Sequence, residues 1–150
     1  MSTRPLRVVL AQHDSESIGT HKRKYAWHIC VETGRDGIHT IATCFYLQGC
    51  PMRGYKVQVV EHTRYRSSHT FRGYIEVGWI KAGDFDHFAE CVFAAVRYPR
   101  DDREEYPPQD WAEAALRKLH ARGFLRALWT HEYITQALVP AFKAWEVGEQ

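Results

Sequence analysis

The chain has 150 residues, of which 45% are hydrophobic and 13% aromatic, and its formal net charge is +2. This length suffices for one domain with one core, and the composition excludes an intrinsically disordered chain. The nearly balanced charge argues against a nucleic-acid-binding protein, which normally carries a concentrated basic face.

The four cysteines, Cys30, Cys44, Cys50 and Cys91, follow no C-x-x-C spacing, so the common zinc and thioredoxin signatures are absent. Residues 1–20 lack the apolar run of a signal peptide, and no apolar stretch reaches membrane-spanning length. Phosphate-loop, H-x-x-x-H and G-x-S-x-G motifs are also absent. We therefore expect a cytoplasmic protein with free thiols, no metal, no cofactor, and neither nucleic acid nor membrane as a partner.

The first half of the chain reads as strands. Runs rich in β-branched and aromatic residues predict them at 6–11, 25–31, 38–46, 55–61 and 71–80. A turn is expected at 34–37, where Gly34-Arg35-Asp36-Gly37 has hairpin composition, and another at 49–54. Polar loops are expected at 14–20 and 62–70.

The second half reads as three helices. The first is predicted from an N-cap at Asp84, with apolar residues to Val96 at helical spacing. The second opens at Pro107-Pro108 and ends at Gly123, a residue suited to the C′ position. The third runs from Thr130 to Glu146 with a kink at Pro140.

Strands followed by helices predict an α+β fold, with an antiparallel sheet of about four to five strands packed against three helices. We expect a single domain over 1–150, with an N-terminal strand and loop at 1–21, the sheet at 22–80 and the helical part at 84–146. The oligomeric state stays open, with a homodimer as one option.

Two places could carry chemistry. On the strand at 25–31, a period of two puts Ala26, His28 and Cys30 on one face, which leaves room in front of an imidazole that could act as general acid or base. The alternative is a histidine satisfied by a neighbouring backbone group. The start of the second helix, with Gln109 and Asp110, could bind an anion or oxyanion, or could simply be capped by Asp110.

Other polar residues complete the candidate site. His39 on the return strand is expected near His28 and joins it as a candidate catalytic residue, together with Gln109 and Asp110. Glu76 could orient a histidine or face water. The candidate substrate-contacting residues are Trp27, Cys30, Tyr74, Glu76 and Trp111, although Cys30 and Trp111 could equally be core residues.

The order of these motifs resembles a known pattern. Trp27-His28, a glycine-turn hairpin, the run from Tyr74 to Ile80, and Pro108-Gln109-Asp110-Trp111 at a helix start resemble a family of small fungal proteins of unassigned function. Those proteins look like circularly permuted papain-like (NlpC/P60-like) domains, and the resemblance covers about residues 22–125. It implies a histidine on an early strand that faces a C-Q-x-W motif at the later helix start.

The chain departs from this pattern at the nucleophile, because Pro108 stands where the family has its cysteine. The resemblance therefore implies that His28 is a pocket residue with Gln109 and Asp110 beside it, and it disfavours a thiol peptidase.

Three candidate functions follow from the sequence. The first is a cofactor-independent cyclase, isomerase or pericyclase of secondary metabolism that acts on an apolar small molecule. The others are a non-catalytic binding module and a hydrolase or acyltransferase that uses another cysteine or Asp110 with His28.

Overall fold

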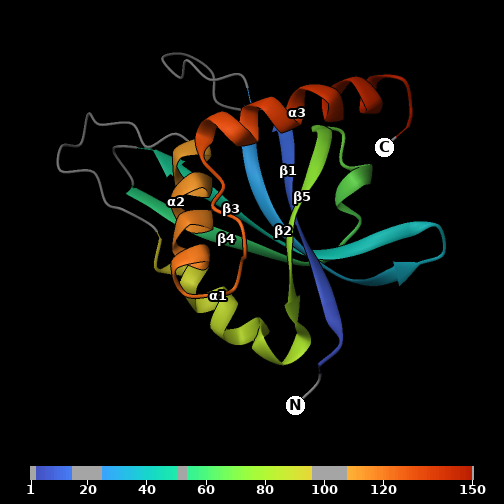
Figure 1. The fold of residues 1–150 in the computed structure, drawn as a ribbon. Helices are drawn as coiled ribbons and strands as arrows, with labels where there is room; N and C mark the ends of the chain where they lie inside the picture. Colours follow the sequence, from blue (N-terminus) through green and yellow to red (C-terminus); the bar gives the residue numbers. More distant parts are fainter. Residues whose placement is uncertain (1–2, 15–24, 51–53, 96–107, 150) are drawn as a thin grey trace.

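The computed structural model describes residues 3–14, 25–50, 54–95 and 108–149 (Figure 1). These residues form five strands, three α-helices and two short 3-10 helices. The strands are β1 (Pro5–Asp14), β2 (Tyr25–Asp36), β3 (His39–Cys50), β4 (Gly54–Thr63) and β5 (Phe71–Lys81). The helices are η1 (Tyr65–Ser67), η2 (Ala82–Asp84), α1 (Phe85–Phe93), α2 (Pro108–Ala121) and α3 (His131–Glu146).

The five strands make one antiparallel sheet in the order β4-β3-β2-β1-β5. β1 therefore lies inside the sheet, paired on one side with β2 and on the other with β5. The β2–β3 hairpin turns at Gly37, whose φ of 62° is a left-handed value that glycine adopts without a steric penalty. The predicted α+β fold, with an antiparallel sheet and three helices, is confirmed.

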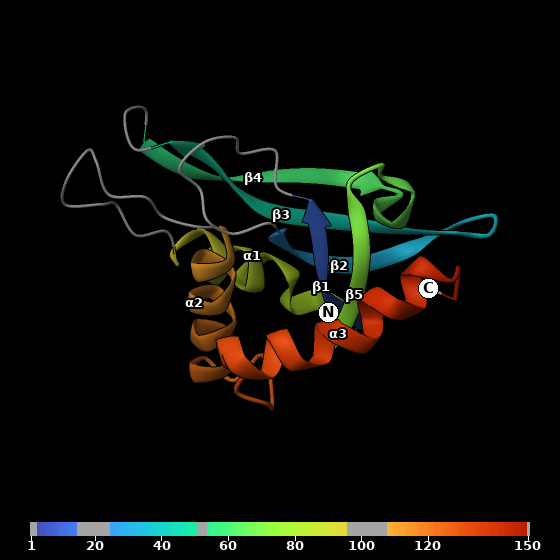
Figure 2. The same cartoon turned by 90° about the horizontal axis from the view of Figure 1, so that it is seen from above.

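All three helices cover one face of the sheet, as the view from above shows (Figure 2). Alternate residues of β2, namely Trp27, Ile29 and Val31, enter the main core on this side together with Trp111 and Leu116 of α2. Antiparallel sheets commonly pack one face on a core and leave the other without helices. The side without helices is called the open face below.

The open face has a smaller core of its own. It consists of Val9, Ala11, Cys30, Ala42, Cys44, Tyr65 and Phe71. Tyr65 belongs to η1, and Trp145 near the end of α3 packs against the same cluster. The open face is therefore partly covered by a short loop and by a helix end, and this partial cover leaves space for a cavity.

The helix ends follow the expected chemistry in two of three cases. Gly123 has a φ of 83°, and the Phe124 amide donates to the Leu119 carbonyl, which closes α2 as a Schellman-type cap. The Thr130 side chain accepts a hydrogen bond from the Tyr133 amide and caps α3. Asp84 occupies the N-cap position of α1, but its side chain makes no capping hydrogen bond.

The predicted strands are all present, and several run further than expected. β1 continues to Asp14 and β2 to Asp36, because hydrogen bonding to neighbouring strands extends into polar residues that sequence patterns assign to loops. The loop predicted at 62–70 contains the end of β4 and all of η1. Pro140 lies inside α3, and Val96 falls outside the described residues. No helix in the described ranges is long and apolar enough to cross a lipid bilayer.

We predict that Trp111→Ala lowers the free energy of unfolding by about 3–5 kcal/mol, because the indole is fully buried between α2 and the sheet. Urea denaturation followed by circular dichroism measures this change. Trp79→Ala is the matched control, since Trp79 is 52% exposed on β5 and should change the stability far less. Equal effects of the two substitutions would contradict this packing.

Candidate functional site

Three rings from three neighbouring strands stack on the open face. His13 is the residue before the last in β1, and His28 lies on β2. Tyr46 lies on β3 opposite His28, since Ile29 pairs with Phe45. The His13 and His28 ring centroids are 4.0 Å apart at an interplanar angle of 17°. The His28 and Tyr46 centroids are 4.8 Å apart at 21°. The rings form a column in which His28 lies between His13 and Tyr46, so both faces of the His28 ring are covered.

His13 has one satisfied and one unsatisfied ring nitrogen. Its Nδ1 lies 2.9 Å from the Thr70 hydroxyl, which in turn lies 3.0 Å from the Ser68 hydroxyl. Its Nε2 is buried and has no hydrogen-bond partner among the described residues. His13 is also one of the few polar residues there that are buried. Buried polar atoms are normally paired. Trp111 Nε1 in the main core also lacks a partner among the described residues, so the His13 nitrogen points to a ligand or a water molecule only because His13 lines a cavity.

Both imidazoles are neutral at physiological pH. Burial, and then the positive charge of Arg72, lower the pKa of His13 to about 4. Burial, and then the neighbouring His13, hold the pKa of His28 well below its usual range. Neutral imidazole carries one N–H donor and one acceptor nitrogen, so this pair offers both hydrogen-bonding roles without a charge.

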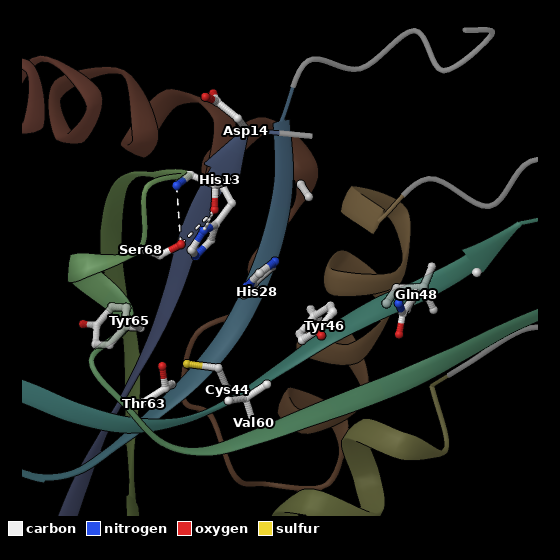
Figure 3. A pocket seen from close by; sticks show the side chains of 14 residues that line it. His13, Asp14, His28, Cys44, Tyr46, Gln48, Val60, Thr63, Tyr65 and Ser68 are labelled. Carbon is white, nitrogen blue, oxygen red and sulfur yellow. Dashed lines mark hydrogen bonds between the residues drawn. The ribbon is translucent and has the colours of Figure 1, made fainter. Parts of the chain in front are cut away.

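A cavity of about 430 Å³ opens beside the stack (Figure 3). β3 and β4 contribute Cys44, Tyr46, Gln48, Val60 and Thr63 to its wall, and the segment after β4 contributes Tyr65, Ser68 and Thr70. The lining mixes hydroxyl, amide and apolar groups in similar measure. This volume suits a small organic molecule. No group of three or more histidine, cysteine or acidic side chains among the described residues is arranged to hold a metal ion.

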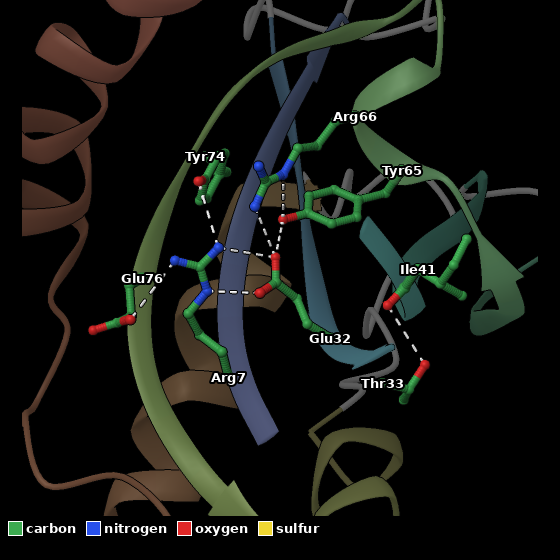
Figure 4. Close-up of polar contacts among 8 residues, drawn as sticks. All are labelled: Arg7, Glu32, Thr33, Ile41, Tyr65, Arg66, Tyr74 and Glu76. Atoms are coloured by element: carbon green, nitrogen blue, oxygen red, sulfur yellow. Dashed lines mark hydrogen bonds and ion pairs between the residues drawn. The ribbon is translucent and has the colours of Figure 1, made fainter. Parts of the chain in front are cut away.

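A partly buried carboxylate fixes the wall that η1 provides (Figure 4). Glu32 on β2 accepts hydrogen bonds from Arg7 Nε at 2.7 Å, from the Tyr65 hydroxyl at 2.6 Å and from Arg66 Nη2 at 2.9 Å. The Arg66 guanidinium also lies 4.2 Å from the ring centre of Tyr74. Glu32 therefore ties β1, β2 and η1 together on the open face.

The electrostatics of this cluster favour the ionised forms of Glu32, Arg7 and Arg66. Burial alone would raise the pKa of Glu32, but hydrogen bonds from Arg7 and Tyr65 outweigh it and leave the pKa below 4.5. The hydrogen bond to Glu32 is the main cause that raises the pKa of Arg7. Burial, followed by the Glu32 carboxylate, raises the pKa of Tyr65, so its hydroxyl stays protonated and donates.

The structure divides the sequence-predicted site between two faces. His28, Cys30, Tyr74 and Glu76 are on the open face, where Glu76 lies 3.8 Å from Arg7 and Tyr74 lies under Arg66. Trp27, Gln109 and Trp111 are on the helix-covered side. Asp110 lies in the first turn of α2. Trp111 is completely buried in the main core and lines neither this cavity nor the one described next.

The expected cavity between His28 and the start of α2 is not formed, and this expectation is wrong. Side chains alternate along β2, so Trp27 and Ile29 point to the helices while His28 points away from them. Gln109 instead donates from Nε2 to the Tyr25 carbonyl at 2.8 Å. It borders a second, mostly apolar cavity of about 490 Å³ with Trp27, Leu138 and Phe142.

His39 is not a neighbour of His28, which corrects a second expectation. It begins β3 at the tip of the hairpin, paired with Asp36, and its Nδ1 lies 3.4 Å from the Ser67 hydroxyl. Tyr46 takes the place opposite His28, and seven residues of strand, roughly 23 Å, separate it from His39. The hairpin turn is tight, so strand positions near the turn cannot pair with residues far from it.

Sequence reasoning missed His13, Tyr46 and Thr70. The alternation that places Val9 and Ala11 on the open face extends to His13, but the polar residues from Gln12 onward hide it. Counting along the hairpin from its turn would place Leu47 opposite His28, because the register shifts by one residue between Glu32 and Gly34. Thr70 reaches the site because the loop after β4 folds back across the sheet, and no local pattern announces this.

The fold is that of a small α+β protein with a cavity on the open side of an antiparallel sheet. A protein-family model described as a family of unknown function (DUF6540) matches residues 14–126, so the chain belongs to that family. The matched segment contains every residue named above in the cavity wall, and His28. It excludes His13 and α3. No curated protein and no solved structure gives a significant match.

We predict that the protein loses stability as the pH falls from 6.5 toward 4. The unfolded chain binds a proton at each histidine near pH 6.5, whereas folded His13 stays neutral down to about 4. His13 alone accounts for about 3 kcal/mol of this loss when the whole shift is realised. The pKa of Glu32 is lowered as well, so its contribution is also lost on acidification, but only at a pH below the ordinary Glu value of 4.5.

Urea denaturation at several pH values between 4.5 and 6.5 isolates the histidine contribution. The double variant His13→Asn/His28→Gln should have a flatter dependence of unfolding free energy on pH than the wild-type protein. His87→Gln, which removes an imidazole that is 71% exposed on α1, should keep the wild-type slope. The same slope in all three proteins would refute the assignment of neutral, buried imidazoles.

We predict that Tyr65→Phe lowers the free energy of unfolding by about 2 kcal/mol, since it deletes a 2.6 Å hydrogen bond to a carboxylate and keeps the ring. Tyr133→Phe on α3, where the side chain is 61% exposed, is the control and should change little. Chemical denaturation at pH 7 compares the two. An unchanged stability of Tyr65→Phe would mean that Arg7 and Arg66 hold η1 without the hydroxyl.

Proposed function

We propose that the protein binds a small planar organic molecule in the cavity beside the His13–His28–Tyr46 stack. The observation that carries this proposal is the buried His13 Nε2, which lacks a partner among the described residues and belongs to a residue that lines a cavity of about 430 Å³. A ligand hydroxyl, N–H or carbonyl would satisfy it in one of its two tautomers. The cost of leaving this nitrogen unpaired is then recovered on binding.

The surroundings indicate the chemical class of the ligand. A flat ring system would stack on Tyr46, the outer ring of the column and part of the cavity wall, because aromatic rings attract one another in offset stacks. Both imidazoles are neutral, so they offer hydrogen bonds and not a counter-charge. Hydroxyls of Thr63 and Ser68 add polar groups to the cavity lining. Phenols, enols and conjugated ketones of two or three rings combine these features.

A reaction on the bound molecule is the second candidate function, and the pair of imidazoles favours it. A neutral imidazole can accept a proton from an enol or from carbon beside a carbonyl, and its N–H can polarise that carbonyl. Such a step belongs to an isomerase or cyclase and needs no cofactor. The role in secondary metabolism comes only from the resemblance of the sequence to small fungal proteins.

The thiol-dependent alternative has less support. Burial, and then the neighbouring Cys44, raise the pKa of Cys30, so this thiol is a poor nucleophile. Asp110 lies on α2, and His28 points away from the helices. We infer that any papain-like ancestry survives in the order of the elements and not in a catalytic geometry. A cytoplasmic location fits the buried free thiols of Cys30, Cys44 and Cys91.

The test uses 2-naphthol and 1-tetralone as planar probes and cyclohexanol as the non-planar control. We predict that both planar probes shift the NMR signals of the His13 and His28 rings, and that cyclohexanol does not. His13→Leu and His28→Leu should each raise the Kd by at least about tenfold, which corresponds to the free energy of one lost hydrogen bond. His87→Leu on α1 should bind like the wild-type protein. Binding unaffected by both pocket substitutions, or absent for both planar probes, refutes the proposed site.

Proton exchange separates the two candidate functions. In deuterated buffer, an enzyme of the proposed kind should speed deuterium uptake at the carbon beside the 1-tetralone carbonyl. The rate should fall at least about tenfold in His13→Leu or His28→Leu. Saturable binding without faster exchange leaves a binding protein and removes the catalytic candidate.

A further inference from the structure

Two cysteines face each other on adjacent strands of the open face. Cys30 on β2 and Cys44 on β3 are directly paired in the antiparallel register. Both are free thiols, and their exposed fractions are 0% and 4%. Both belong to the small core of the open face. Directly opposite residues of an antiparallel pair point their side chains to the same side of the sheet.

This placement fits the geometry of a disulfide. Directly paired residues of antiparallel strands have Cα atoms about 4.5–5.5 Å apart, and disulfides span Cα separations of about 4.4–6.8 Å. No strand movement is therefore needed to join the two sulfur atoms. The third buried thiol, Cys91, lies in α1 within the main core and on the other side of the sheet. It cannot reach either of them in the folded protein.

Only one of the two thiols is reached from the cavity. Cys44 lines it, and its sulfur lies between Thr63 and His28 in the close-up (Figure 3). Cys30 lies behind, without exposed surface. A small oxidant that enters the cavity would therefore react with Cys44 first. Cys30 would then be the thiol nearest to the oxidised Cys44 sulfur.

We propose that Cys30 and Cys44 form a reversible cross-strand disulfide when a hydroperoxide enters the cavity. The Cys44 thiol attacks the peroxide oxygen, which gives a sulfenic acid and releases the alcohol, or water from hydrogen peroxide. The Cys30 thiol then attacks the Cys44 sulfur, forms the S–S bond and releases water. Both thiols are oxidised and the peroxide is reduced. Two electrons from a reducing dithiol restore the thiols by exchange.

The burial of Cys30 makes the second step slow compared with that of an exposed resolving thiol. Burial, and then the adjacent Cys44, raise its pKa, so little thiolate is present at neutral pH. The sulfenic acid should therefore live long enough to be trapped. Bond formation draws the Cys44 sulfur toward β2 and changes the cavity wall beside His28. The modification does not depend on which molecule the cavity binds.

The experiment uses the variant Cys50→Ser/Cys91→Ser, in which Cys30 and Cys44 are the remaining thiols. Treated with hydrogen peroxide while folded, then denatured and alkylated with N-ethylmaleimide, it should lose both labelling sites and the mass of two hydrogen atoms. Dithiothreitol should restore both sites. Dimedone added during oxidation should trap Cys44. The His28 ring signal should shift between the oxidised and reduced forms.

The control variant Cys44→Ser/Cys50→Ser keeps Cys30 and Cys91, which lie on opposite sides of the sheet. It should form no intramolecular disulfide under the same treatment. Peptide mapping of the oxidised wild-type protein, after trypsin and chymotrypsin digestion, repeats the test without substitutions, so a misfolded variant does not decide the outcome. Two labelled thiols after oxidation, or linkage of Cys30 to another cysteine, would overturn the proposal.

Discussion

The alternation of side chains along β2 is the constraint on which the site depends. Trp27, Ile29 and Val31 must enter the main core to cover α2 and α3, and this requirement sends His28 and Cys30 to the other face. A shift of one residue would place an imidazole in the core and an indole in the cavity. The burial of Trp27 on the helix-covered face therefore determines that His28 and Cys30 lie on the open face.

The open face is built differently from the helix-covered face. Aliphatic and aromatic packing holds the helices, whereas one carboxylate, Glu32, organises the polar side by binding two arginines and a tyrosine at once. Such a cluster costs desolvation and gains hydrogen bonds, so its value is mainly to set positions. Tyr65 is fixed by it, and Tyr65 is also part of the cavity wall. The cluster thus shapes the cavity without occupying it.

The elements that depend on local signals were predictable, and the site was not. Gly123, Thr130 and the alternating strands identify α2, α3 and the sheet from residues close together in the sequence. His28 was found because it lies on a strongly patterned strand. Its partners were missed for two reasons. His13 lies within the polar run from Gln12 to Glu16, which resembles a loop, and Thr70 reaches the site through a long-range fold of the chain. The face toward which His28 points depends on which alternate set the helices bury, and the strand sequence alone leaves both choices open.

The inner position of β1 has a consequence for how the chain folds. Leu10 pairs with Ile75, so β1, which is synthesised before the other strands of this sheet, has its second edge paired only when β5 is complete. Closing so long a segment costs entropy before any contact repays it, which slows folding. Until β5 has been synthesised, the nascent chain carries an apolar strand with an open side, which chaperones or other chains can bind.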